Sequence, residues 1–260
     1  MTSQQTTGFT IEPYPGLPLT VRDVGAGRPV VVLHGGGGPV TMTGVVDHFA
    51  ATSRVLAPTH PGWDGTPRPE WFSGVGDLAE TYLELLDDRD VSDVVVLGSS
   101  FGGWIASEMT VRDRGRRIGA LIIVDAIGPR VEGHEVRIPT APPGSPAPAA
   151  PAAPPTGQGS GAPEPPRGPS PEAIRTMLAY TGPSLSDPKL LHRLARVKVP
   201  ALAVWGENDT VVTPDFGRAY AAAIPGARFE LIRDAGHLPA REAPQATFAA
   251  IDAFLAAAGR

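Results

Sequence analysis

The chain has 260 residues, of which 42% are hydrophobic, and this is enough for one sizeable α/β domain carrying an insertion. Its formal net charge of −5 leaves no excess of cations to neutralise phosphates, so neither nucleic acids nor membrane surfaces are expected partners. The absence of cysteine excludes disulfides, a thiolate nucleophile and sulfur-ligated metal sites.

The predicted elements alternate between strands and helices along most of the chain. The runs that predict strands are apolar throughout rather than at alternate positions, which is typical of strands covered on both faces in a parallel sheet. We therefore expect an α/β fold, with a mostly parallel central sheet flanked by helices and with loops gathered at the carboxyl ends of the strands. Strands are predicted at 30–33, 55–57, 94–97, 120–124, 201–205 and 229–232, and helical spacing appears at 78–86, 104–109, 216–224 and 248–255.

This alternation stops once, between about Ile127 and Val199. The sequence predicts a core in two parts, residues 1–127 and 199–260, with a cap or lid insertion at 128–198 between them. From Pro139 to Pro171, 13 of 33 residues are proline, so this tract offers few backbone donors and little to bury. We expect it to be extended or mobile, polyproline-like in places, beside the entrance to the site.

The second half of the insertion contains two helix-start signals. Ser170 before Pro171, and Asp187 before Pro188, each resemble an N-cap followed by proline at the first helical position. They predict two short helices, at 171–180 and at 188–196. The insertion is thus predicted to be a reduced, proline-rich cap with a small helical part.

The strongest local motif is G-x-S-x-G at Gly98-Ser99-Ser100-Phe101-Gly102. A predicted strand precedes it and a predicted helix follows it, which is the context that this motif requires. In a strand-turn-helix elbow, flanking glycines remove side chains that would clash and the serine hydroxyl is lifted above the sheet. Ser100 is therefore the candidate nucleophile.

A serine hydroxyl needs an adjacent base, and that base needs an orienting carboxylate. Asp209 follows the predicted strand at 201–205, and His237 follows the last predicted strand. Since the carboxyl ends of parallel strands meet at one edge of a sheet, both are expected near Ser100. Three other acids are considered. Glu207 is the rival to Asp209, Asp125 at a strand end is an alternative acid, and Asp234 is interpreted as a solvated loop residue.

The segment His34-Gly35-Gly36-Gly37-Gly38-Pro39 follows the strand predicted at 30–33. Glycines there expose backbone N–H groups, and amides that point at a developing oxyanion stabilise the transition state of acyl transfer. The N–H groups of Gly36 and Phe101 are the candidate oxyanion hole, and the ring of His34 is expected to hold the loop. A phosphate-binding loop is not favoured because G-x-x-x-x-G-K-[ST] is absent.

Five segments in this order, "LHGGGGP", "THPGWDGTPRP", "GSSFGGW", "WGENDTVVTP" and "AGHLP", resemble the α/β-hydrolase superfamily. The resemblance covers nearly all of the chain outside residues 130–185. Within the superfamily, the glycine-rich loop and the spacing of 28 between Asp209 and His237 are similar to esterases and to carbon-carbon bond hydrolases of meta-cleavage products. The resemblance implies Ser100 as nucleophile, His237 as base, Asp209 as acid, and Gly36 with Phe101 as oxyanion hole.

The chain departs from this family pattern in two places. Many relatives have Asp-x-Pro-Gly-aromatic-Gly where this chain has Thr59-His60-Pro61-Gly62-Trp63-Asp64. Relatives also place a helical cap where this chain has the proline-rich tract. A serine at position 100 disfavours the dehalogenase and most epoxide-hydrolase branches, because these need an aspartate there.

The sequence therefore predicts a cofactor-independent serine hydrolase acting through a Ser-His-Asp triad and an acyl-enzyme, with small to medium hydrophobic esters as substrates. Alternatives are carbon-carbon hydrolysis of meta-cleavage-type diketones, perhydrolysis, and a receptor-like protein that binds a ligand with little turnover. No cofactor or metal is expected. A small-molecule substrate is the expected partner, self-association into a homo-oligomer is left open, and the N-terminal sequence without a leader pattern predicts a cytoplasmic location.

Overall fold

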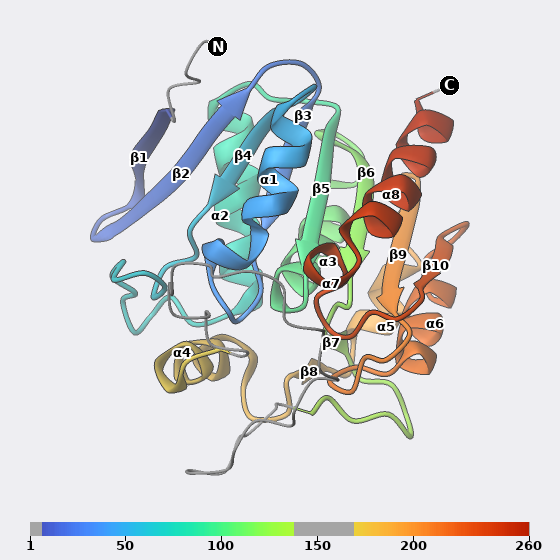
Figure 1. Ribbon diagram of the computed structural model, residues 1–260. Helices are drawn as coiled ribbons and strands as arrows, with labels where there is room; N and C mark the ends of the chain where they lie inside the picture. The colour runs from blue at the N-terminus through green and yellow to red at the C-terminus, as the bar shows by residue number, and fades with distance from the viewer. Residues whose placement is uncertain (1–6, 138–168, 260) are drawn as a thin grey trace, which may run out of the picture.

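The computed structural model describes residues 7–137 and 169–259. In these residues an eight-stranded sheet has the strand order β1-β2-β4-β3-β5-β6-β9-β10 (Figure 1). Strands β3 to β6, β9 and β10 are parallel to one another, so the expected α/β fold with a mostly parallel sheet is confirmed. The strands of the sheet are β1 (Thr7–Tyr14), β2 (Leu17–Gly25), β3 (Pro29–Leu33), β4 (Arg54–Pro58), β5 (Val94–Ser99), β6 (Ile118–Val124), β9 (Ala201–Gly206) and β10 (Arg228–Ile232).

An N-terminal hairpin that the sequence analysis did not assign extends the sheet at one edge. Strand β1 pairs antiparallel with β2, and β2 pairs antiparallel with β4. The burial of β2 alternates along its first half, with Leu17, Leu19 and Val21 fully buried and the more exposed Pro18 and Thr20 between them. Such alternation is typical of a strand covered on one face, so a search for continuous apolar runs passes over it.

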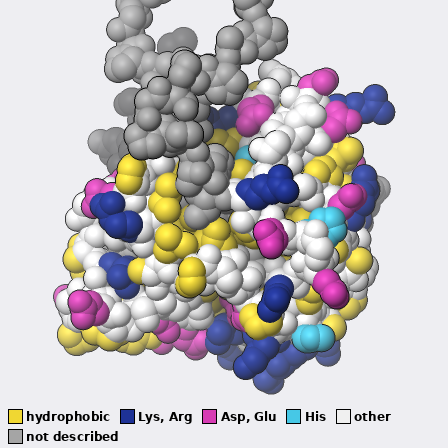
Figure 2. Space-filling view, turned by 90° about the horizontal axis from the view of Figure 1, so that it is seen from below, with side chains coloured by type: hydrophobic (Ala, Val, Ile, Leu, Met, Phe, Trp, Pro, Cys, Tyr) yellow, Lys and Arg dark blue, Asp and Glu magenta, His cyan; other side chains and the backbone are white. Residues whose placement is uncertain are grey.

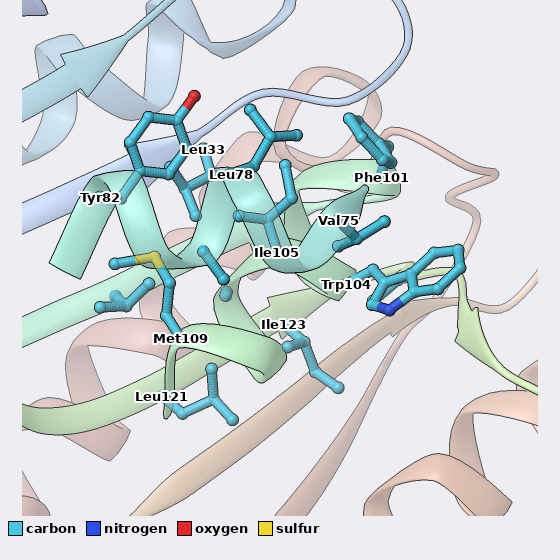
Figure 3. Close-up of a cluster of buried hydrophobic side chains, with 14 of the residues drawn as sticks. Leu33, Val75, Leu78, Tyr82, Phe101, Trp104, Ile105, Met109, Leu121 and Ile123 are labelled. Atoms are coloured by element: carbon cyan, nitrogen blue, oxygen red, sulfur yellow. The ribbon is translucent and has the colours of Figure 1, made fainter. Parts of the chain in front are cut away.

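Helices cover both faces of the sheet (Figure 1). Helices α1 and α8 pack on one face, and α2, α3 and α6 pack on the other. Each face has its own hydrophobic core, the first under α1 and α8 and the second under α2, α3 and α6. Successive residues of a strand point to opposite faces, so in β3 Val30 and Val32 belong to the first core and Val31 and Leu33 to the second. Figure 3 shows part of the second core, where side chains of α2 and α3 meet those of the strands. The helices of the core are α1 (Thr43–Ala50), α2 (Val75–Asp88), α3 (Phe101–Asp113), α6 (Pro214–Ala222), α7 (Pro239–Glu242) and α8 (Pro244–Ala258), with a 3-10 turn at Pro39–Met42.

The described part of the insertion contains helices α4 (Pro171–Thr181) and α5 (Leu190–Leu194). The predicted start of α4 is confirmed, because the Ser170 hydroxyl caps it by accepting from the Ala173 N–H at 3.1 Å. The predicted start of the second helix at Pro188 is wrong. Asp187 lies in β8 (Ser186–Asp187), which pairs with β7 (Gly128–Pro129), and its carboxylate accepts from the Lys189 N–H in a turn that precedes α5.

The expectation of an extended or mobile tract falls on residues 139–168, which lie outside the described residues. Figure 1 shows α4 below the carboxyl ends of the strands, on the side where a cap was expected. In residues 7–137 and 169–259, no helix has both the length and the hydropathy needed to cross a membrane.

Candidate active site

Ser100 lies in a sharp turn between β5 and α3. Its φ of 53° and ψ of −116° are unusual for a residue with a side chain, and such strain is tolerated where the surroundings fix the turn. The flanking positions must be glycine because a side chain there would collide with the backbone. A Cβ atom on Gly98 would lie 2.1 Å from the Gly102 carbonyl oxygen, and one on Gly102 would lie 2.2 Å from that of Leu33. The elbow that the motif predicts is therefore present.

The structure brings Ser100, His237 and Asp209 into one hydrogen-bonded chain. The Ser100 Oγ lies 3.0 Å from the His237 Nε2, and the His237 Nδ1 lies 2.8 Å from the Asp209 Oδ2. Because a carboxylate oxygen only accepts, Nδ1 carries the ring proton and the neutral ring leaves Nε2 as an acceptor for the serine hydroxyl. In this arrangement the ring can take the serine proton.

The Asp209 carboxylate is held in place before any substrate binds. Its Oδ1 accepts from the backbone N–H groups of Val211 at 2.7 Å and Val212 at 3.1 Å, which leaves Oδ2 for His237. The residue is only 4% exposed. The loop after β9 thus presents one carboxylate oxygen to the histidine in a fixed direction.

The other acids that the sequence analysis considered do not contact His237. The Oδ1 of Asp125 accepts from the Gly206 N–H at 2.9 Å, and its burial together with the neighbouring charge of Asp209 raises the pKa of Asp125 well above its usual value. Glu207 is exposed and accepts from the Asp234 N–H. Asp234 is itself exposed, as expected for a solvated loop residue.

The His237 loop is held by a carboxylate that the sequence analysis did not single out. Glu242, at the end of α7, accepts from the N–H of Gly236 at 2.5 Å and from the N–H of Leu238 at 3.1 Å. These two amides flank His237, so Glu242 fixes the loop on both sides of the ring. The five-residue spacing between His237 and Glu242 is the only sequence signal for this contact, and many short loops share it.

The glycine-rich loop after β3 lies directly beside Ser100. A Cβ atom on Gly35 would approach the Ser100 Cβ to 3.0 Å. Among the described residues, the N–H groups of Gly36 and Phe101 have no acceptor, as expected for Phe101 at the first position of a helix. The Gly36 carbonyl instead accepts from the Trp63 indole N–H at 3.0 Å, which orients this peptide.

Two buried histidines stack behind this loop with their ring centroids 3.8 Å apart. The His34 Nδ1–H donates to the Gly35 carbonyl at 2.8 Å, and the His34 Nε2 accepts from the His60 backbone N–H at 3.0 Å. The His60 Nε2–H donates to the His34 carbonyl at 3.0 Å, and its Nδ1 accepts from the Tyr82 hydroxyl at 2.5 Å. Each ring holds one proton and uses both nitrogens, so the pair is neutral and fixes the start of the loop.

Burial is the main cause of this neutrality. It lowers the pKa of His34 to about 4. It lowers the pKa of His60 well below the usual value as well, and the neighbouring His34 adds to that effect. His34 thus holds the loop, in the way expected from the sequence, whereas the part played by His60 was not expected.

An aromatic wall stands beside the nucleophile. The Trp63 ring stacks on Phe101 at 5.7 Å and on Tyr180 of α4 at 6.1 Å, and the Tyr180 hydroxyl donates to the Pro61 carbonyl. Met177, one turn earlier in α4, lies against Gly36. Figure 2 looks onto the face below the strands, and hydrophobic side chains gather in its middle. The surroundings of Ser100 are therefore largely apolar.

Within the described ranges, no three His, Asp or Glu side chains gather in a way that could hold a metal ion. The groups available for chemistry at this edge of the sheet are a serine, a histidine, a carboxylate and two backbone amides that have no acceptor among the described residues. This set suits nucleophilic acyl transfer.

Comparisons with known proteins agree with the architecture. A model of the Alpha/beta hydrolase family matches residues 30–251. The 2-hydroxy-6-oxo-2,4-heptadienoate hydrolase of Pseudomonas putida is 32% identical over 118 residues, which are 44% of this chain and 42% of that protein. The matched segment thus spans less than half the length of that relative. A 2-hydroxy-6-oxononadienedioate/2-hydroxy-6-oxononatrienedioate hydrolase of Cupriavidus pinatubonensis is 27% identical over 257 residues, covering 83% of this chain and 82% of that protein.

Solved structures share the fold at lower identity. A thermophilic esterase from Thermogutta terrifontis superposes with a TM-score of 0.70 at 19% identity, covering 98% of this chain and 99% of that one. The carboxylesterase CesB from Bacillus subtilis superposes with a TM-score of 0.69 at 15% identity, covering 97% and 92%. At these identities the likeness concerns the fold.

Proposed function

The chain belongs to the alpha/beta hydrolase family, and from this premise we propose that it is a serine hydrolase in which Ser100, His237 and Asp209 form the catalytic triad. The observation that carries the proposal is the unbroken chain of contacts from the Ser100 Oγ through both nitrogens of His237 to Asp209, at 3.0 and 2.8 Å. The amides of Gly36 and Phe101, which have no acceptor in the described part of the chain, supply the proposed oxyanion hole.

In the proposed mechanism, the Ser100 Oγ attacks the carbonyl carbon of an ester while its proton passes to the His237 Nε2. The negative charge on the carbonyl oxygen is stabilised by the N–H groups of Gly36 and Phe101. When the ester C–O bond breaks, the His237 proton goes to the departing alkoxide, which leaves as an alcohol. Water then gives a proton to His237, attacks the acyl-enzyme and releases a carboxylic acid and the free Ser100 hydroxyl.

Small to medium hydrophobic esters are the proposed substrates. The support comes from the wall beside the nucleophile, which consists of Trp63, Phe101, Tyr180 and Met177. Such side chains favour an apolar acyl or alkyl group through burial of its surface. A cytoplasmic location and self-association stay predictions from the sequence.

The test is hydrolysis of p-nitrophenyl esters of increasing acyl length. We expect wild-type protein to release p-nitrophenol and Ser100→Ala to lose this activity while it keeps the wild-type melting temperature. A fluorophosphonate probe should label Ser100 in the wild type and leave Ser100→Ala unlabelled. Full activity in Ser100→Ala would contradict the mechanism, and tight ligand binding without turnover in the wild type would favour a receptor-like role.

Carbon-carbon bond hydrolysis is the second candidate, and it is favoured by the similarity to the heptadienoate hydrolase of Pseudomonas putida and to the nonadienedioate hydrolase of Cupriavidus pinatubonensis. The same triad and oxyanion hole would serve this reaction, which consumes one water and cleaves the bond beside a ketone. A 2-hydroxy-6-oxodienoate and a p-nitrophenyl ester offered to the same preparation separate the two candidates. A kcat/KM at least about tenfold higher for the dienoate would make it the main reaction.

A further inference from the structure

A crevice of about 600 Å³ separates the core helices α2 and α3 from the insertion helices α4 and α5. Its floor is one face of α3, where Trp104, Glu108 and Val111 follow each other at spacings of four and three residues. Tyr180 of α4 and Arg193 of α5 stand at its sides. No residue of the proposed triad is among the described residues that line it. Tyr180 is shared with the wall beside Ser100, so the crevice adjoins the candidate active site without containing the triad.

The lining carries more positive than negative charge, in a chain whose net charge is negative. Arg193 pairs with Glu108 and lies 2.7 Å from Asp187, and Arg112 lies 3.5 Å from Glu108. Among the described residues, the other two arginines have no carboxylate partner. The arginines of the lining are Arg112, Arg114, Arg193 and Arg196, and its acids are Glu108 and Asp187.

Two residues of the lining also contain buried N–H groups without an acceptor in the described part of the chain. These groups are the indole Nε1 of Trp104, a residue only 4% exposed, and the guanidinium Nε of Arg193. A buried donor without a partner costs free energy, and an acceptor atom beside it relieves that cost. Two such donors belong to residues that line one cavity, and the same lining has two exposed guanidinium groups without a carboxylate partner in the described part of the chain; together they indicate that an acceptor-rich ligand fits there.

We propose that this crevice is a second ligand site, which binds a small oxyanion, a carboxylate or a phosphate monoester, carried on an aromatic or other apolar body. Guanidinium groups match oxyanions with two parallel hydrogen bonds, so Arg114 and Arg196 hold the charged end. The apolar end lies on Trp104, Val75 and Val111. Figure 3 shows Trp104 and Val75 side by side, from α3 and α2.

Binding at this site stabilises the insertion against the core, because its walls belong to both. The site does not depend on the proposed function, since it uses no atom of the triad. Its occupant is recognised by charge and by apolar surface, so an acid released from an ester and a phosphorylated metabolite share the chemistry that the site requires.

The test is isothermal titration of the full chain with benzoate, phenyl phosphate and inorganic phosphate. The test variant is Arg114→Gln/Arg196→Gln. The matched control is Arg228→Gln/Arg233→Gln, which removes the same charge from two other exposed arginines. We expect at least one aromatic anion to bind the wild type and the control alike, to bind the test variant about tenfold or more weakly, and to raise the melting temperature of the wild type.

Tighter binding of benzoate or of phenyl phosphate tells which oxyanion the site accepts, and either result supports the proposal. Equal binding to the wild type and the test variant would overturn it, because the anion would then lie elsewhere. Absence of binding by both aromatic anions would also overturn it. If inorganic phosphate bound as tightly as phenyl phosphate, the proposed contact between the apolar body of the ligand and Trp104 would be contradicted. Should the double variant fail to fold, Arg196→Gln alone replaces it, since Arg196 is exposed.

Discussion

At the Asp209 carboxylate, both oxygens are engaged before substrate arrives, one by two backbone amides and one by the ring of His237. An asparagine in its place keeps the shape of the side chain but offers no charge to stabilise the imidazolium, and it favours the wrong tautomer of His237. We expect Asp209→Asn to lower kcat for a p-nitrophenyl ester by about 10³- to 10⁴-fold, with little change in KM.

Glu207→Gln is the matched control for Asp209→Asn, because it neutralises the rival acid on the same loop. The Glu207 side chain is exposed and accepts only from the Asp234 N–H among the described residues. We expect this variant to keep kcat within a factor of about two. If Glu207→Gln lost as much activity as Asp209→Asn, the assignment of Asp209 as the acid of the triad would be contradicted.

The neutral pair His34 and His60 predicts a loss of stability in acid. Both pKa values are lower in the folded chain than the usual value of about 6.5, that of His34 being about 4. Above pH 6.5 both rings are neutral in the folded and the unfolded chain, so the contribution to stability is complete there. Below pH 6.5 the unfolded chain binds more protons than the folded chain. Each ring therefore lowers the free energy of unfolding by about 1.4 kcal/mol per pH unit, until the pKa of that ring in the folded chain is reached.

Urea unfolding between pH 4 and pH 8 measures this dependence. We expect His60→Asn to unfold with a shallower pH dependence below pH 6.5 than the wild type, because one of the two rings no longer titrates. His192→Asn removes an exposed histidine and should follow the wild-type curve. Parallel curves for the wild type and His60→Asn would contradict the assignment of a neutral buried ring.

Ser100, Asp209 and His237 were chosen from the sequence because a glycine-flanked serine, an acid and a histidine each follow a predicted strand, and parallel strands end at one edge. Their contact agrees with that argument, while their catalytic role stays a prediction. The parts of Glu242 and His60 could not be predicted. Both depend on distances between loops, which the order of residues along the chain does not give.

At the scale of elements, Arg193 joins the insertion to the core. It lies on α5, contacts the buried Glu108 of α3, and lies 2.7 Å from Asp187 of β8. We expect Arg193→Met to lower the free energy of unfolding by roughly 1–3 kcal/mol, because Glu108, whose side chain is 4% exposed, then keeps only the more distant Arg112. The urea midpoint of unfolding measures this change.

Arg116→Met is the control for Arg193→Met, because Arg116 is 70% exposed on its side chain and lies 3.9 Å from Asp87. It should change stability by less than about 0.5 kcal/mol. Adding Glu108→Gln to Arg193→Met removes the unpaired buried charge, so we expect the double variant to recover part of the loss. Strictly additive losses would show that the two side chains do not interact.

The elements most reliably predicted were those whose signal is local. The parallel strands of the central sheet are mostly apolar, with β5, β6 and β9 almost entirely so, and α4 begins at a serine followed by proline, as expected. The β1–β2 hairpin was passed over because its burial alternates. The start of α5 was wrong because Asp187 pairs in β8 and accepts from the Lys189 N–H instead of capping a helix at Pro188. Tertiary pairing there overrides a capping signal that looks complete in the sequence.

At the scale of the molecule, the sheet is covered on both faces by core residues of the described chain, with α1 and α8 on one side and α2, α3 and α6 on the other. The insertion contributes to one of these cores through Val131, Leu185 and Val197 and, on its helices, through Met177, Tyr180, Leu190 and Leu194. Each of these four lies in α4 or α5. Among the described residues, the second half of the insertion supplies core side chains and the wall beside Ser100, and from its composition we expect the proline-rich half to add little to stability.

Deleting residues 142–166 tests that division, because their composition offers little apolar surface to bury. Loop-closure entropy changes slowly with length, so we expect the free energy of unfolding to change by less than about 1 kcal/mol. If the tract borders the entrance to Ser100, KM for esters with long acyl chains should rise severalfold while kcat for the acetate is kept. A Gly/Ser replacement of equal length is the control, since it keeps the span and removes the alanine and proline side chains. Loss of cooperative unfolding in the deletion would show that the tract is packed against the core, and unchanged KM values at every acyl length would remove it from the entrance.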